Sequence, residues 1–144
     1  MALINLGFYL TVTLMAGNLQ LDNGTVGGNA SLGSDGAMTL GTLAVIGDAT
    51  ATAGTTLAVD TLDVDGDASL SSGDDFRVTT LDVAGNADLS SGATLAVGQG
   101  TIGGNATLAS TGSTSIDALA VQGSLDVTSG AVLTARSLAS AAAM

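Results

Sequence analysis

A glycine recurs every nineteen residues through most of this 144-residue chain, and no other feature of the sequence limits the possible folds as strongly. The residue after it is Asn or Asp in five repeats and Ser in the sixth, and a second glycine follows after seven or eight residues. Gly followed by Asn or Asp is typical of a turn, because glycine adopts positive φ freely and an Asx side chain bonds nearby backbone. Each repeat is therefore predicted to have two corners. The first-corner glycines are Gly28, Gly47, Gly66, Gly85, Gly104 and Gly123.

Apolar residues occupy fixed places in the repeat when the first-corner glycine is numbered position 0. Positions 2, 4, 10, 12, 15 and 17 are apolar in 33 of 36 cases when Ala is counted, and the exceptions are Gly100, Thr114 and Ser140. Side chains two residues apart point the same way in a strand, so each pair of positions predicts a short strand with one buried face. All thirteen Asp residues fall outside these positions, which supports the same assignment of inward and outward residues.

A unit of nineteen residues cannot bury its inner face alone, but identical units stacked in register can. The sequence therefore predicts an all-β fold, a parallel β-helix or β-solenoid with three strands per 19-residue coil and a triangular cross-section. About six to seven coils, at about 4.8 Å each, would make a column roughly 30 Å long. A β-sandwich also has strands of period two, but it does not require a fixed nineteen-residue period.

The composition excludes several classes of function. His and Cys are absent, which excludes disulfides, thiolate or imidazole chemistry and the usual zinc sites. A net charge of −11 with only two basic residues argues against nucleic-acid binding, which needs a basic face. No cofactor and no catalytic residue is predicted. A hydrophobic content of 46% is too high for a disordered chain.

The two ends of the chain depart from the repeat. Residues 1–18 alternate apolar and polar side chains and are predicted to form one longer strand that feeds the solenoid of residues 19–140, with residues 141–144 as a tail. This strand is expected to cap the open end of the core, to anchor the protein on a partner, or both. No basic residue precedes the apolar stretch, and the stretch is too short for a membrane span, so neither a signal peptide nor a membrane span is expected. The candidate anchor residues are Phe8, Tyr9, Leu10, Val12 and Leu14.

The candidate chemical sites are few. Asp63, Asp65 and Asp67 resemble a calcium loop in spacing, although the repeat also explains them as surface and corner residues. Arg77 is expected to pair with a nearby surface carboxylate. Rows of Ser and Thr on the outer faces are too irregular for an ice-binding ladder. Their small size instead favours side-by-side packing of whole columns.

The segments LDVDGDASLSSG (residues 62–73) and LDVAGNADLSSGATLAV (residues 81–97) resemble three groups of β-solenoid proteins. One is the repeats of bacterial surface adhesins of the filamentous-haemagglutinin kind, and another is the modules of phage fibres and head or tail appendages. The third is the bactofilins, cytoskeletal proteins whose solenoids stack head to tail. The resemblance extends over roughly residues 19–140, and these relatives imply an adhesive, virion or filament-forming role.

Together these observations favour a non-enzymatic structural protein, a head-decoration or fibre component of a virion that docks through its apolar N-terminus. The partners expected are copies of itself, as a homotrimer or array, and a capsid or tail protein bound through residues 1–18. The expected location is the virion surface or an extracellular one. A self-polymerising, bactofilin-like cytoplasmic filament is the first alternative, and a surface adhesin or glycan- or ice-binding solenoid is the second.

Overall fold

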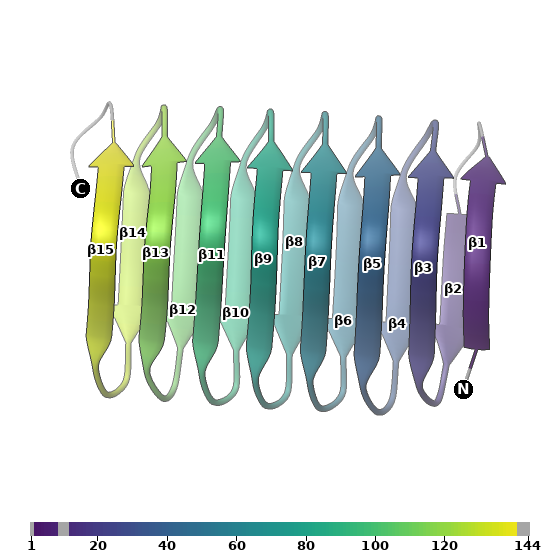
Figure 1. Cartoon of the computed structure of the whole chain (residues 1–144), viewed down its shortest axis with the longest axis horizontal. Helices are drawn as coiled ribbons and strands as arrows, with labels where there is room; N and C mark the ends of the chain where they lie inside the picture. Colours follow the sequence, from purple (N-terminus) through teal and green to yellow (C-terminus); the bar gives the residue numbers. More distant parts are fainter. Residues whose placement is uncertain (1, 9–11, 141–144) are drawn as a thin grey trace.

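The computed structural model describes the backbone of residues 2–8 and 12–140 and the side chains of residues 17–140. The described residues form a column of stacked coils with fifteen strands and no helix (Figure 1). The strands are β1 (Ala2–Phe8), β2 (Val12–Ala16), β3 (Leu19–Val26), β4 (Ala30–Ser34), β5 (Met38–Val45), β6 (Ala49–Ala53), β7 (Leu57–Val64), β8 (Ala68–Ser72), β9 (Phe76–Val83), β10 (Ala87–Ser91), β11 (Leu95–Ile102), β12 (Ala106–Ser110), β13 (Thr114–Val121), β14 (Leu125–Ser129) and β15 (Leu133–Ser140).

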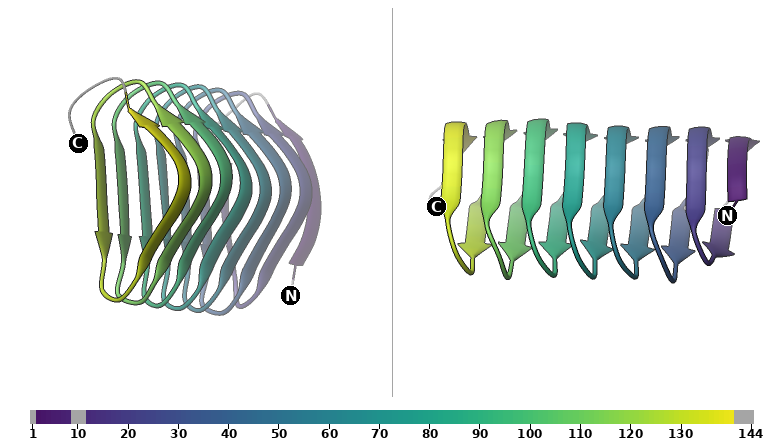
Figure 2. Two further views of the ribbon diagram at one scale, coloured as in Figure 1. Left: turned by 60° about the vertical axis from the view of Figure 1, so that its left-hand side comes forward. Right: turned by 60° about the horizontal axis from the view of Figure 1, so that its bottom comes forward.

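The strands divide into two parallel sheets. The odd-numbered strands form an eight-stranded sheet and the even-numbered strands a seven-stranded sheet, each in sequence order, so every coil adds one strand to both sheets. Equivalent residues pair across neighbouring coils, for example Leu62 with Leu81 and Leu70 with Leu89. The chain advances as a right-handed coil in both views (Figures 1 and 2), the hand that parallel crossovers strongly prefer. The predicted parallel β-solenoid is thus confirmed.

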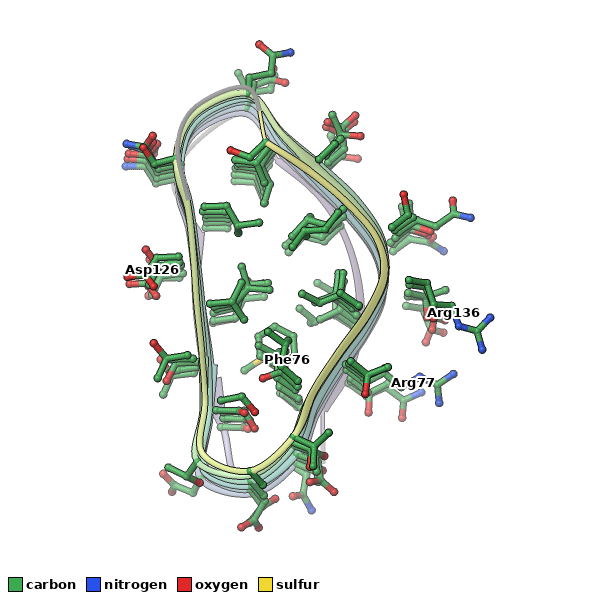
Figure 3. All side chains as sticks on the ribbon, turned by 90° about the vertical axis from the view of Figure 1, so that its left-hand side faces the viewer. Phe76, Arg77, Asp126 and Arg136 are labelled. Carbon is green, nitrogen blue, oxygen red and sulfur yellow. The ribbon has the colours of Figure 1, made fainter. Side chains whose placement is uncertain are left out.

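Each coil contains two strands, where the sequence predicted three. Positions 10, 12, 15 and 17 all lie in one eight-residue strand, because no turn separates them. Positions 12 and 15 are three residues apart, so two outward residues stand between them and the strand bends there to keep both buried. The pairing omits the first of these residues: Leu40 pairs with Val59, and the next pair is Thr42 with Thr61. The cross-section therefore has one straight side and one bent side, a flattened form of the predicted triangle (Figure 3).

The N-terminal segment forms two strands where one longer strand was predicted. β1 pairs with β3 and β2 pairs with β4, so these strands extend both sheets by one further coil. The register shifts between Ile4 and Asn5, and Val12 pairs with Ala30, a separation one residue shorter than the repeat. The capping and anchoring roles of this segment stay predictions.

The core is a set of columns of stacked apolar side chains, in the inward positions that the sequence predicted. Leu40, Leu62, Leu89 and Ile102 are completely buried, and Phe76 points into the interior between the two sides (Figure 3). In β15, Leu133 is 47% exposed, because its strand has a single described neighbour, β13.

The three polar or glycine exceptions in the core each have a partner. At Gly100 an added Cβ would lie 2.7 Å from Cδ1 of Leu119, so the leucine of the next coil fills the empty position. Thr114 is buried, and its hydroxyl lies 2.8 Å from the Ser110 hydroxyl. Ser140 donates to the Gly123 carbonyl at 2.9 Å. The interruptions in the apolar pattern are therefore compensated by neighbouring groups.

The corner glycines are required for a reason other than the predicted one. None of the described residues has positive φ, so conformational freedom is not what these positions use. An added Cβ on Gly66 would lie 2.3 Å from Asp48 Oδ1 and 2.7 Å from the Gly47 carbonyl oxygen. Coils stacked this closely leave no room for a side chain at the first corner, which selects glycine there from Gly47 to Gly123.

Candidate functional site

The Asn and Asp residues after the corner glycines form a ladder that joins the coils. Each side-chain Oδ1 accepts a hydrogen bond from the backbone N–H of the equivalent residue one coil later. Asp67 N donates to Asp48 Oδ1 at 2.9 Å, and Asn86 N donates to Asp67 Oδ1 at 2.7 Å. The same bond joins Asn29 to Asp48, Asn86 to Asn105 and Asn105 to Ser124. These residues therefore have a structural task, and the adjacent glycine leaves space for it.

The second corner is held by a buried row of serines at position 6, an inward position that the sequence interpretation missed. Ser91 Oγ lies 2.6 Å from the carbonyl oxygen of Asp74 and 2.7 Å from that of Thr94, so its one hydroxyl hydrogen has an acceptor on either side. The row has Ala53 in one coil and otherwise consists of Ser34, Ser72, Ser91, Ser110 and Ser129. No buried side-chain nitrogen or oxygen lacks a hydrogen-bond partner within residues 17–140. The recurring "SSG" or "ASTG" before this corner was the available signal.

The candidate cation ligands do not converge. Asp63 is exposed on the outer side of β7, Asp65 follows that strand, and Asp67 is committed to the ladder. No group of three or more Asp residues placed to hold a metal ion occurs in the part of the chain with described side chains. The three residues are separated because β7 ends at Val64 and the chain turns a corner at Gly66, so Asp63 stands on a strand while Asp65 and Asp67 flank the corner.

Among the described carboxylates, Asp75 has a pKa that is shifted by its hydrogen bonds. Its Oδ1 accepts the Thr94 hydroxyl at 2.6 Å and the Thr94 backbone N–H at 3.2 Å. These two hydrogen bonds favour the ionised form and hold the pKa of Asp75 below its ordinary value of 3.8. A lowered folded-state pKa stabilises the fold above pH 3.8, and this contribution is lost as the pH falls through the lowered value.

Replacing Thr94 by valine is expected to raise the pKa of Asp75, because the stronger of its two hydrogen bonds is removed. The backbone N–H of Thr94 remains and continues to favour the ionised form. Carboxyl NMR titration measures the midpoint directly. Thr79→Val, at an exposed threonine on another part of the column, is the control and leaves the Asp75 midpoint unchanged. Equal midpoints in the wild type and Thr94→Val would refute this explanation.

The straight side of the column is a flat surface of small polar side chains, here called the flat face. It consists of the outward residues of the five-residue strands from β4 to β14 and has two acidic positions, Asp88 and Asp126 (Figure 3). Its exposed or half-exposed members are Ser31, Thr50, Thr52, Ser69, Ser71, Asp88, Ser90, Thr107, Ala109, Asp126 and Thr128.

The opposite side, formed by the outward residues of the long strands from β3 to β15, is here called the bent face. Arg77 and Arg136, the two basic residues of the chain, both project from it (Figure 3). Two adjoining open hollows lie between them and share Thr79, Gly98 and Asp117. Arg136 Nε lies 3.6 Å from Asp117 Oδ1, with 81% and 62% of the two side chains exposed, so this pair adds little stability. Arg77 forms no ion pair with any described carboxylate, contrary to the sequence-based expectation.

The predicted anchor residues are only partly described. Phe8 lies in β1, and Val12 and Leu14 lie in β2, whereas Tyr9 and Leu10 fall outside the described residues. The described strands thus place part of the candidate anchor in the first coil of the column (Figure 2).

Comparisons with protein-family models, with curated proteins and with solved structures found no match for this chain. The class of the protein is defined by its fold alone, which is a right-handed parallel β-solenoid with two sheets. The described residues include no helix long and apolar enough to cross a membrane.

Proposed function

We propose that this protein is a non-enzymatic structural component that packs side by side with copies of itself, as a head-decoration, fibre or appendage protein of a virion. Support for the structural role comes from the uniform column. Stacked apolar side chains fill its interior, and both corners are tied from coil to coil by hydrogen bonds. Such a column keeps its shape without a ligand, and its outer faces are what it offers to partners.

The flat face is the observation that carries this proposal. Its side chains are small and mostly uncharged, so two columns can approach to about the 10 Å spacing of packed sheets. Hydroxyl groups along the face can bond across such a contact or keep ordered water there. The virion setting and docking through residues 1–18 come from the resemblance to phage appendage modules and from the apolar N-terminal sequence.

A charged, bulky residue on the flat face tests the proposal. Ser69 is exposed on β8 near the middle of this face, so Ser69→Arg is expected to convert the wild-type oligomer into a smaller species in sedimentation velocity. Thr56→Arg adds the same side chain at an exposed corner and is expected to leave the oligomer intact. Retention of the oligomer in Ser69→Arg, or its equal loss in both variants, would contradict packing through the flat face.

A further inference from the structure

The charges on the bent face form an ordered row. Position 13, at the bend of each long strand, is outward in every described coil and reads Asp22, Gly41, Asp60, Thr79, Gly98, Asp117 and Arg136. Because the coils are in register, these residues follow one another along the column at about 4.8 Å per coil. Asp60 and Arg136 have opposite charges, and each lies two coils from Gly98. Thr79 and Asp117 each lie one coil from it.

We infer that the bent face binds a second copy of this chain, turned antiparallel about a two-fold axis that runs along β11. This symmetry sets β7 of one copy against β15 of the other and β9 against β13. Arg136 then faces Asp60 of the second copy, Asp117 faces Thr79, and Gly98 faces itself. Every polar contact occurs twice. The missing side chain of Gly98 lets the two bends approach at the centre.

The neighbouring rows agree with this arrangement. At position 11, Arg77 faces Ser115 of the second copy, and its long side chain reaches toward Asp117 two residues further along the same strand. At position 16, Asp63 and Asp82 face Ala139 and Ala120. Opposite charges therefore meet along the interface, and no aspartate of these rows faces another aspartate.

Three other placements of the axis bring like charges directly opposite one another, which is unfavourable. An axis along β9 sets Asp82 against its own copy, and an axis along β13 does the same for Asp117. A two-fold axis parallel to the column brings each coil against its own equivalent, and so Asp60 against Asp60. The register centred on β11 avoids these contacts and uses both arginines of a strongly acidic chain.

This interface is separate from the flat face, so it can exist whether or not the flat-face packing proposed above occurs. The absence of native cysteine makes a single introduced cysteine a clean probe of its register. Gln99 is exposed on β11 and faces itself across the axis, so Gln99→Cys is expected to form a disulfide-linked dimer under mild oxidation. Thr42→Cys lies at the equivalent exposed position on β5, three coils away, and is expected to form no disulfide-linked dimer, because it faces no described residue of the second copy.

Charge reversal in the Gln99→Cys background completes the test. Asp60→Arg alone and Arg136→Asp alone are each expected to slow cross-linking by about tenfold. The double variant Asp60→Arg with Arg136→Asp is expected to restore the original rate, which a merely structural effect of either change would not do. Equal cross-linking at Gln99→Cys and Thr42→Cys would overturn the inference, as would failure of the double variant to recover.

Discussion

Replacing Leu81 by aspartate is expected to destabilise the protein by at least about 4 kcal/mol, enough to unfold a domain of ordinary stability. Leu81 is 1% exposed and stacks between Leu62 and Gly100 of the neighbouring coils. A carboxylate there would lose its hydration and find no cation, since both arginines project outward on the bent face. The damage would also spread, because each inward side chain is part of the packing of the coils on both sides. Urea denaturation followed by circular dichroism measures the loss.

The adjacent residue provides the control for Leu81. Asp82 is exposed on the bent face and pairs in register with Asp63, another aspartate. Asp82→Ala removes a like-charge contact and changes the free energy of unfolding by a few tenths of a kcal/mol, roughly, in the stabilising direction. Comparable destabilisation by Leu81→Asp and Asp82→Ala would mean that the inward and outward assignments of the long strands are wrong.

Replacing Gly85 by valine is expected to cost about 3 kcal/mol, the second-largest effect among these predictions. Its Cβ would lie 2.3 Å from Asp67 Oδ1 and 2.7 Å from the Gly66 carbonyl oxygen, and the carbonyl belongs to backbone that cannot rotate away. The substitution thus forces apart two coils and disturbs the ladder bond between Asp67 and Asn86. Thermal unfolding should show a clear fall in the transition temperature.

Gly17 offers a matched comparison, because an added Cβ there would meet none of the described atoms within 4 Å. Gly17→Val is therefore expected to leave the unfolding transition nearly unchanged. If Gly85→Val were equally mild, close stacking of the corners would not explain the nineteen-residue glycine period.

Most of the fold could be predicted from the sequence, because a fixed period and a two-residue alternation together determine which side chains stack. The number of strands could not be predicted by counting apolar pairs. The three-residue step from position 12 to position 15, as from Val59 to Leu62, produces a bend within one strand and not a turn between two. The serine row was missed because a serine before a glycine is typical of a turn. Ser72 and Ser91 are nevertheless buried, and hydrogen bonds to the carbonyl oxygens of the corner satisfy their hydroxyl groups.

The surface was less predictable than the core. Asp63, Asp65 and Asp67 have a ligand-like spacing in sequence, but β7 ends at Val64 and the chain turns at Gly66, so the three residues lie on different sides of a corner. The relation between Asp60 and Arg136 is hidden in the sequence by the seventy-odd residues between them. It becomes visible only when the register aligns position 13 of every coil along a single row.

The proposed function depends on the outer faces of a rigid column, and both proposed contacts join copies of the same chain. The flat face offers a broad contact of small side chains, and the bent face offers a narrow contact with matched charges. If one copy used both its flat face and its bent face, it would contact one neighbour on each side. An assembly built in this way could grow by adding further copies, which suits a structural layer or appendage.

The proposed self-association is tested by the molar mass of the unmodified protein in solution, measured by light scattering over a range of concentrations. The chain mass is 13.7 kDa, and we predict a mass that rises with concentration to a small multiple of that value. A mass that stays at 13.7 kDa across the whole concentration range would contradict it.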